Sequence, residues 1–236
     1  MLEACESTNS EAMRRAPALD APCWILAHRQ TGGRGRRGRD WHDPEGNFAA
    51  SLVMRPDGPA SQVALRSFTA SLALFDALVA ATGQTAPFAL KWPNDVLLDD
   101  GKLAGILLES VSDGHGVAHL VIGFGVNLIS APAAEPGAIR PVSLLEQTGC
   151  RIGPEAFLDL LAPAFARWEA QFQSFGFGHV RTAWLGRAAR RGQMVEARIA
   201  DEVIRGIFET IDDHGAIVLA TPEGRRSIPA ADIHFT

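Results

Sequence analysis

A nine-residue segment at positions 31–39 consists almost wholly of glycine and arginine, with four residues of each. Arginine is almost never fully buried without a partner, and glycine disfavours the interiors of helices and strands. The segment follows an apolar run of strand length at residues 23–27 and precedes another at residues 47–54. The chain must therefore fold with a cationic loop between two strands.

The charge of this Gly/Arg loop contrasts with that of the whole chain, which carries a net charge of −5 and has a pI of about 5.8. Glycine lets backbone N–H groups approach an oxyanion closely, and the guanidinium fork matches phosphate or carboxylate. We interpret the loop as a cradle for an anion. The alternatives are a nucleic-acid-binding arm and a solvated loop without a ligand. Nucleic-acid-binding domains usually have a wider basic footprint, which favours the cradle.

Apolar periodicity predicts an α+β domain over residues 1–188, in which strand-length runs accompany segments with helical spacing. We expect helices at about residues 8–15, 59–81 and 157–172, and strands at about residues 23–27, 47–54, 88–92, 95–98, 102–111 and 117–126. Thr8 and Glu11 have the spacing of a capping box at the start of the first helix. Residues 113–116 predict a hairpin turn.

The pattern changes after residue 189. Turn residues, among them 200–202, separate short apolar runs at residues 194–200, 203–211, 216–220 and 225–228. Even spacing of short strands is typical of a small β-barrel. We therefore place a domain boundary near residue 189, with a second domain at residues 189–236.

A second polar motif, Lys91-Trp92-Pro93-Asn94-Asp95, directly follows the apolar run 88–90. A lysine at this position needs an anionic partner if it points into a cavity. The oxygens of Asn94 and Asp95 suit Mg²⁺, which binds through one or two carboxylates and the phosphates of a substrate. A strand-end turn with a solvated lysine is the alternative. Further along, Gly105 within an apolar strand indicates close approach of a ligand or another backbone, or a simple bulge.

Other chemical motifs are not evident in the sequence. Cys5, Cys23 and Cys150 form no CxxC pair, and we interpret them as reduced thiols. Without a nucleophile motif, any reaction depends on electrostatics and positioning.

The chain has no run of the roughly 18 apolar residues that a membrane span needs, and its N-terminus is acidic where a signal peptide is basic. We expect a cytoplasmic protein that does not bind a membrane.

Taken in order, these motifs resemble the biotin protein ligase family. The matching segments are Ser7-Thr8-Asn9, residues 30–41 with the Gly/Arg loop, Lys91-Trp92-Pro93-Asn94-Asp95, residues 102–107 (KLAGIL) and Gly123-x-Gly125-Val126-Asn127. The resemblance implies a fold like that of class II synthetases and biotin–lipoate ligases. Its catalytic domain, residues 1–188, would have a mixed β-sheet with flanking helices, and residues 189–236 would form an SH3-like β-barrel.

The resemblance also implies a two-step reaction. Biotin and ATP give biotinyl-5′-adenylate, and the biotinyl group then passes to a lysine of a biotin carboxyl carrier protein domain. The implied catalytic residues are Lys91, Arg36 and Arg34. The residues implied to bind biotin are Ser7, Thr8, Asn9, Gln30, Gly33, Arg34, Gly35, Arg36, Lys91 and Gly105. Those implied to bind ATP or the adenylate are Arg34, Arg36, Arg37, Arg39, Trp41, Lys91, Asn94 and Asn127. Asp95 is the expected ligand of Mg²⁺.

The chain departs from some members of this family, which carry a DNA-binding domain before the catalytic domain. The Ser-Thr-Asn motif begins here at residue 7, so we expect a short form without DNA binding or repression. A monomer and a homodimer both remain open. A lipoate-type ligase and a nucleic-acid-binding protein that uses the Gly/Arg loop are the alternative functions.

Arg36→Ala is expected to weaken retention of the adenylate sharply. Removing one donor that stabilises a developing anion costs about 3–4 kcal/mol in the transition state. Retention of radiolabelled adenylate after gel filtration measures the effect. Retention equal to that of the wild type would contradict the cradle assignment.

Overall fold

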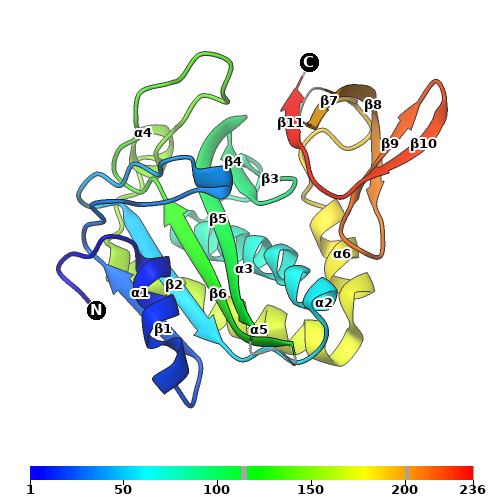
Figure 1. The fold of residues 1–236 in the computed structure, drawn as a ribbon. Helices are drawn as coiled ribbons and strands as arrows, with labels where there is room; N and C mark the ends of the chain where they lie inside the picture. Colours follow the sequence, from blue (N-terminus) through cyan, green and yellow to red (C-terminus); the bar gives the residue numbers. More distant parts are fainter. Residues whose placement is uncertain (113–115, 200–201, 236) are drawn as a thin grey trace.

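The computed structural model describes residues 1–112, 116–199 and 202–235, and it contains two antiparallel sheets (Figure 1). The larger sheet has the strand order β1-β2-β6-β5-β4-β3. Its strands are β1 (Cys23–Ala27), β2 (Phe48–Met54), β3 (Phe88–Lys91), β4 (Asp95–Leu98), β5 (Gly101–Ser112) and β6 (Val117–Val126). Isolated parallel bridges from Leu2 to Ala27 and from Cys5 to Gln30 lie alongside the β1 edge of this antiparallel sheet.

Helices cover both faces of the larger sheet. Strand alternation sends Leu26, Leu52 and Ile122 to one face, where they pack with α3 and α5 in the main core. On the other face, Ile25 and Val53 pack against α1, which Figure 1 shows in dark blue. The helices are α1 (Thr8–Arg15), α2 (Ala60–Ala64), α3 (Arg66–Thr82), α4 (Leu144–Thr148), α5 (Pro154–Phe175) and α6 (Phe177–Leu185), with short 3-10 turns η1 (Ala16–Ala18) and η2 (Arg36–Gly38).

The helix expected at residues 59–81 is divided at Leu65. The Leu65 N–H donates to the Gln62 carbonyl over 3.2 Å, and the Phe68 N–H donates to the Leu65 carbonyl over 3.0 Å. This tighter turn ends α2 and starts α3. The span Ala60–Thr82 is long and apolar enough to cross a membrane by length and composition, but 72% of its most apolar window is buried in the protein, as in a core helix.

The capping box predicted at Thr8 and Glu11 is wrong. Ser7 is the N-cap of α1, and it makes no side-chain capping bond. The Thr8 hydroxyl donates instead to the Gln30 side chain, and the Glu11 carboxylate pairs with Arg14 and Arg15 on its own helix. The Thr8 hydroxyl, which the local pattern assigned to capping the helix, is thus used in a long-range hydrogen bond to Gln30.

The smaller sheet has the strand order β10-β9-β8-β7-β11 and matches the expected SH3-like barrel. Its strands are β7 (Met194–Ile199), β8 (Glu202–Ile211), β9 (Ile217–Thr221), β10 (Gly224–Ile228) and β11 (Asp232–Phe235). Neither β11 nor α6 was predicted, because β11 is short and α6 has few apolar residues at helical spacing. The predicted turns at 113–116 and 200–202 lie largely outside the described residues.

The two sheets are joined by hydrogen bonds near the predicted boundary at residue 189. Leu90 of β3 exchanges backbone hydrogen bonds with Arg187 and Ala189, each over 2.8 Å. The buried Trp92 donates its indole N–H to the Gly215 carbonyl over 2.9 Å. The end of β3, where the Lys91 motif begins, therefore lies against the second sheet. The boundary itself stays a prediction.

A buried ion pair joins α3 to α5 beneath the larger sheet. Arg66 donates through Nε and Nη2 to Glu169 Oε1, over 3.0 and 2.8 Å. Their side chains are only 2% and 10% exposed, and the Arg66 guanidinium lies 5.0 Å from the Phe172 ring centroid. Each charged side chain is stabilised by the other, because neither is hydrated by solvent.

Glu169→Ala is expected to lower the free energy of unfolding by about 3–5 kcal/mol, because it leaves the Arg66 charge buried without a partner. Urea unfolding at pH 7 measures the loss. Glu202→Ala is the matched control. It breaks the ion pair between Glu202 and Arg226, whose side chains are 53% and 47% exposed, respectively. Such exposed pairs contribute less than about 1 kcal/mol to stability. Equal losses in the two variants would contradict the assignment.

Candidate active site

A cavity of about 570 Å³ lies on the α1 side of the larger sheet, next to β11 of the smaller one. It is lined by the start of α1, the Gly/Arg loop, the ends of β3 to β6 and the loop around residues 132–141. The volume is typical of a site for a small molecule or cofactor. Most of the predicted site residues line it: Ser7, Thr8, Asn9, Gln30, Arg34, Gly35, Arg36, Arg39, Trp41, Lys91, Asn94, Asp95, Gly105 and Asn127.

Two predicted residues do not line the cavity. Gly33 lies behind Trp41, where its carbonyl accepts the Trp41 N–H over 2.9 Å, and a Cβ on Gly33 would overlap the Trp41 carbonyl. Arg37 adopts a left-handed backbone conformation with φ of 57°, and its guanidinium pairs with Asp232. These residues shape the loop rather than the wall of the cavity.

Glycines of β5 and β6 form part of the floor. A Cβ at Gly123 would overlap the Asn9 side-chain amide, and one at Gly125 would overlap the Trp41 indole. At Gly105 a Cβ would come within 3.2 Å of the indole. The absence of side chains at these positions lets Asn9 and Trp41 lie directly against the sheet, so Gly105 has a close-packing role.

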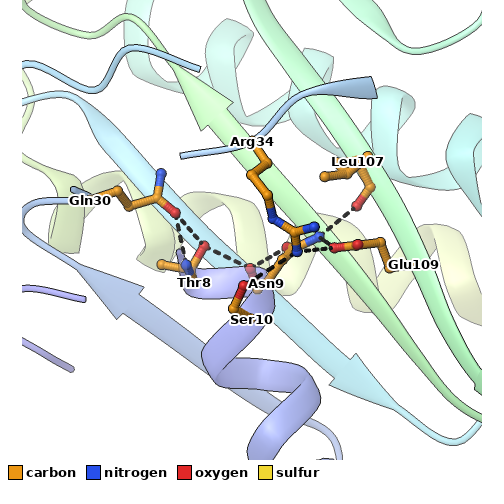
Figure 2. Close-up of polar contacts among 8 residues, drawn as sticks. Thr8, Asn9, Ser10, Gln30, Arg34, Leu107 and Glu109 are labelled. Atoms are coloured by element: carbon orange, nitrogen blue, oxygen red, sulfur yellow. Dashed lines mark hydrogen bonds and ion pairs between the residues drawn. The ribbon is translucent and has the colours of Figure 1, made fainter. Parts of the chain in front are cut away.

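Uncharged polar groups cluster where α1 begins (Figure 2). The Thr8 N–H and hydroxyl both donate to Gln30 Oε1, over 2.8 and 3.1 Å. The buried Ser51 hydroxyl lies 2.8 Å from Thr8 Oγ1 and 2.6 Å from Asn9 Oδ1. Strand β2 thereby connects two residues of the Ser-Thr-Asn motif through a residue that the sequence did not single out.

Glu109 of β5 orients two of the predicted site residues. Its Oε2 accepts the Asn9 amide N–H over 2.8 Å and an Arg34 N–H over 3.1 Å, and Arg34 also reaches Ser10 over 3.3 Å (Figure 2). The Asn9 amide is therefore fixed, with nitrogen toward Glu109 and oxygen toward Ser51. Arg34 is held beside this polar cluster.

Asp95 lies between Lys91 and Lys102. Its carboxylate is 2.8 Å from Lys102 Nζ and 3.8 Å from Lys91 Nζ. Burial opposes ionisation of Asp95, but the two ammonium groups hold its pKa below the usual value. Burial lowers the pKa of Lys91, while Asp95 counteracts that shift. Lys102 was not predicted, although it begins the KLAGIL segment that was singled out for Gly105.

The Gly/Arg loop contacts the second sheet through one carboxylate. Asp232 at the start of β11 accepts from Arg37 over 2.7 Å and from Arg39 over 2.8 Å. Arg36 is directed the other way, and its Nη1 lies 3.4 Å from Asn94 Oδ1. Burial lowers the pKa of Arg36. Asp232 could not be found from the sequence, because the strand that carries it was not predicted.

Asn127 contributes a free acceptor at the end of β6. Its amide nitrogen donates to the Val142 carbonyl over 3.1 Å, whereas its buried Oδ1 has no hydrogen-bond partner among the described residues.

The donor set does not form a protein-built metal site. No group of three or more His, Cys, Asp or Glu side chains suited to a metal ion occurs within the described part of the chain. Asp95 Oδ1 and Oδ2 each already face an ammonium group. The Asp95 carboxylate therefore fits the role of counter-ion to two lysines better than that of metal ligand.

Comparisons with known proteins agree over the whole chain. The model of the biotin/lipoate A/B protein ligase family matches residues 2–127, and that of the biotin protein ligase C-terminal domain matches residues 192–235. A Paracoccus denitrificans protein named biotin–[acetyl-CoA-carboxylase] ligase is 55% identical, with 100% of this chain and 99% of the relative covered. A bifunctional ligase/repressor of Bacillus subtilis is 31% identical, with 89% and 65% covered.

The solved structures agree as well. Biotin protein ligase from Aquifex aeolicus in complex with biotin and ATP matches with a TM-score of 0.82 at 26% identity. The match covers 99% of this chain and 96% of that one. Both sheets are therefore part of the shared architecture.

Asp95→Asn is expected to lower the free energy of unfolding at pH 7 by about 3 kcal/mol, since the buried Lys91 and the half-buried Lys102 lose their shared counter-charge. The pKa of Asp95 is depressed in the folded state, so its stabilisation is present above the unfolded value near 4 and is lost only as the pH falls further. Urea unfolding at pH 7 and pH 5 should give similar losses. Asp57→Asn, at an exposed position, is the control. A variant as stable as the wild type would contradict the counter-ion role.

Proposed function

The chain belongs to the biotin/lipoate A/B protein ligase family, and we propose that its cavity carries out both steps of a biotin protein ligase. Ligase activity on biotin is the function common to the full-length relative and the structural neighbour. The observation that carries the proposal is the division of one cavity into an uncharged polar cluster and a strongly basic region. The two regions suit the two substrates, biotin and ATP.

The polar cluster fits the ureido head of biotin. That group has one acceptor and two donors, and Thr8, Asn9 and Gln30 offer hydroxyl, amide oxygen and amide nitrogen atoms. These side chains are already hydrogen-bonded to one another and to Ser51. The site is therefore preorganised before any ligand binds, which lowers the ordering cost of binding.

The basic region fits the first step. A carboxylate oxygen of biotin attacks the α-phosphorus of ATP, the bond to the β-phosphate oxygen breaks, and pyrophosphate leaves. Two anions must approach each other, and fixed positive charge offsets their repulsion. The cavity supplies that charge from the side chains of Arg34, Arg36, Arg39, Lys91 and Lys102. Arg34 lies beside the polar cluster. The biotin carboxylate, at the other end of the molecule from the ureido head, would meet the phosphate nearer to Arg36 and Lys91.

Trp41 and Asn127 are suited to the adenine. The Trp41 indole lies against the glycine floor and provides an aromatic surface, and Asn127 lines the cavity at the end of β6. Adenine would then lie toward β6, with the phosphates toward Lys91.

In the second step, the neutral ε-amine of a carrier lysine attacks the acyl carbon of the adenylate. The amide bond forms, AMP leaves and a proton is released. We propose that the carrier is a biotin carboxyl carrier protein domain, since the full-length relative is named for acetyl-CoA carboxylase. The chain need provide no covalent intermediate in either step, because the adenylate itself activates the acyl group.

Mg²⁺ remains a prediction as a third component. When bound, it would reduce the negative charge of the ATP phosphates. The described residues form no protein-built metal site, so Mg²⁺ would enter together with the ATP phosphates. We therefore assign it no step. The absence of DNA binding, the cytoplasmic location and the choice between monomer and homodimer also stay predictions.

The alternatives receive less support. A lipoate-type ligase has no use for a polar cluster that is complementary to a ureido head. A nucleic-acid-binding arm needs arginines that are free to pair with phosphates, yet the exposed Arg34, Arg37 and Arg39 are each paired with an acidic side chain. Thermal-shift titration distinguishes a biotin ligase from a lipoate-type ligase, because biotin but not lipoate should raise the melting temperature.

Incubation with biotin, Mg-ATP and a carrier domain is expected to add one biotinyl group to the carrier, measured by intact mass. Lys91→Ala should slow pyrophosphate release by about 10²–10³-fold, because it removes a charge that stabilises the transition state. Arg151→Ala changes an exposed arginine outside the cavity and should react normally. An unmodified carrier that another ligase can biotinylate would overturn the proposal.

A further inference from the structure

Glu109 does not line the cavity, yet it contacts two residues that do. It belongs to β5, and its side chain points toward the start of α1 and the Gly/Arg loop (Figure 2). The side chain is 25% exposed. The proposed reaction uses no atom of this carboxylate, so its contacts with the cavity wall need a separate explanation.

A single oxygen of Glu109 joins two parts of the site that are distant in the sequence. Its Oε2 accepts the Asn9 amide N–H over 2.8 Å and an Arg34 N–H over 3.1 Å. Asn9 belongs to the first turn of α1, whereas Arg34 belongs to the Gly/Arg loop. Hydrogen bonds to an ionised acceptor are about twice as strong as neutral ones, so this oxygen connects helix and loop firmly.

The contacts of Asn9 determine which part of its amide remains available to a ligand. Its nitrogen donates to Glu109 and, over 3.4 Å, to the Leu107 carbonyl, so its donors are occupied. Its Oδ1 accepts from Ser51 over 2.6 Å and keeps a second lone pair. Asn9 can therefore offer a ligand in the cavity an acceptor but not a donor.

Arg34 has the complementary polarity, because a guanidinium group only donates hydrogen bonds. Its Nη2 contacts Ser10 over 3.3 Å and Glu109 over 3.1 Å, while Nε and Nη1 have no partner within the described residues. The ureido head of biotin carries one acceptor oxygen and two N–H donors. A donor at Arg34 and an acceptor at Asn9 match that head.

We propose that Glu109 is a positioning residue that holds Asn9 as an acceptor and Arg34 as a donor for the ureido head, and thereby sets the affinity of the cavity for biotin. The inference rests on the proposed function. Glu109 acts through these two neighbours, because it does not itself line the cavity. Its effect should be confined to biotin binding, since the reacting groups meet nearer to Arg36 and Lys91.

The experiment is isothermal titration of biotin into wild type and Glu109→Gln. Glutamine has the same shape, but it lacks the charge and replaces one acceptor oxygen with a donor. We expect the Kd for biotin to rise about tenfold, the scale of losing one hydrogen bond to a charged group. In steady-state assays KM for biotin should rise about tenfold, with kcat and KM for ATP within about twofold.

Glu209→Gln is the matched control. Glu209 also lies on a strand, β8, is 31% exposed and accepts from one arginine, Arg225, over 2.6 Å, but it lies outside the cavity. Its substitution should leave biotin affinity unchanged. Both variants should melt within about 4 °C of the wild type, since partly exposed ion pairs contribute little to stability.

Double-mutant cycles test whether Glu109 acts through its two neighbours. In the Asn9→Ala background and in the Arg34→Ala background, the effect of Glu109→Gln on biotin affinity should fall from tenfold to about threefold or less, because one partner is already gone. A tenfold effect that persists in both backgrounds would contradict the proposed route.

The outcomes distinguish this inference from the proposed function. Wild-type protein that does not bind biotin would overturn the proposed function, and this inference with it. Wild type that binds biotin, together with a Glu109→Gln variant of equal affinity, would overturn this inference alone. A Glu109→Gln variant that loses melting temperature and kcat together would have a structural role, and that result would also overturn the inference.

Discussion

The site depends on three carboxylates that keep a concentrated set of basic side chains in place. Asp95 lies between Lys91 and Lys102, Glu109 accepts from Arg34 and Asn9, and Asp232 accepts from Arg37 and Arg39. Without them, like charges around the cavity would repel one another, and the buried Lys91 would lose its counter-charge. Each carboxylate comes from a different strand, so the charge pattern requires both sheets to be folded.

The sheet architecture explains why these groups can meet. Glycines in β5 and β6 leave room for Asn9 and Trp41 to lie against the backbone, and the start of α1 brings the polar cluster to the same face. Trp92 and Leu90 hold the end of β3 against the second sheet, which places Lys91 near β11. The core beneath contributes stability, while the opposite face carries the polar chemistry.

Local sequence patterns predicted the strands well, because Val117–Val126 and Asp95–Leu98 are apolar runs bounded by turn residues. The motifs also located most of the cavity wall. Glu109 and Asp232 escaped prediction for a physical reason: an acidic residue on a strand looks like an ordinary surface position until its cross-fold partner is known. The Thr8 capping box failed for the related reason that Gln30, far along the chain, competes for the same hydroxyl.

The contact of Asp232 with Arg37 and Arg39 has an entropic consequence. A glycine-rich segment that is free between its two ends loses much backbone freedom when it closes on a ligand. Here the segment is also anchored near its C-terminal end, at Arg37 and Arg39, by a side chain almost two hundred positions away in the chain. Part of the ordering cost is thereby met when the protein folds rather than when a ligand binds. The last strand of the chain thus helps to determine how tightly a loop near its beginning can hold an anion.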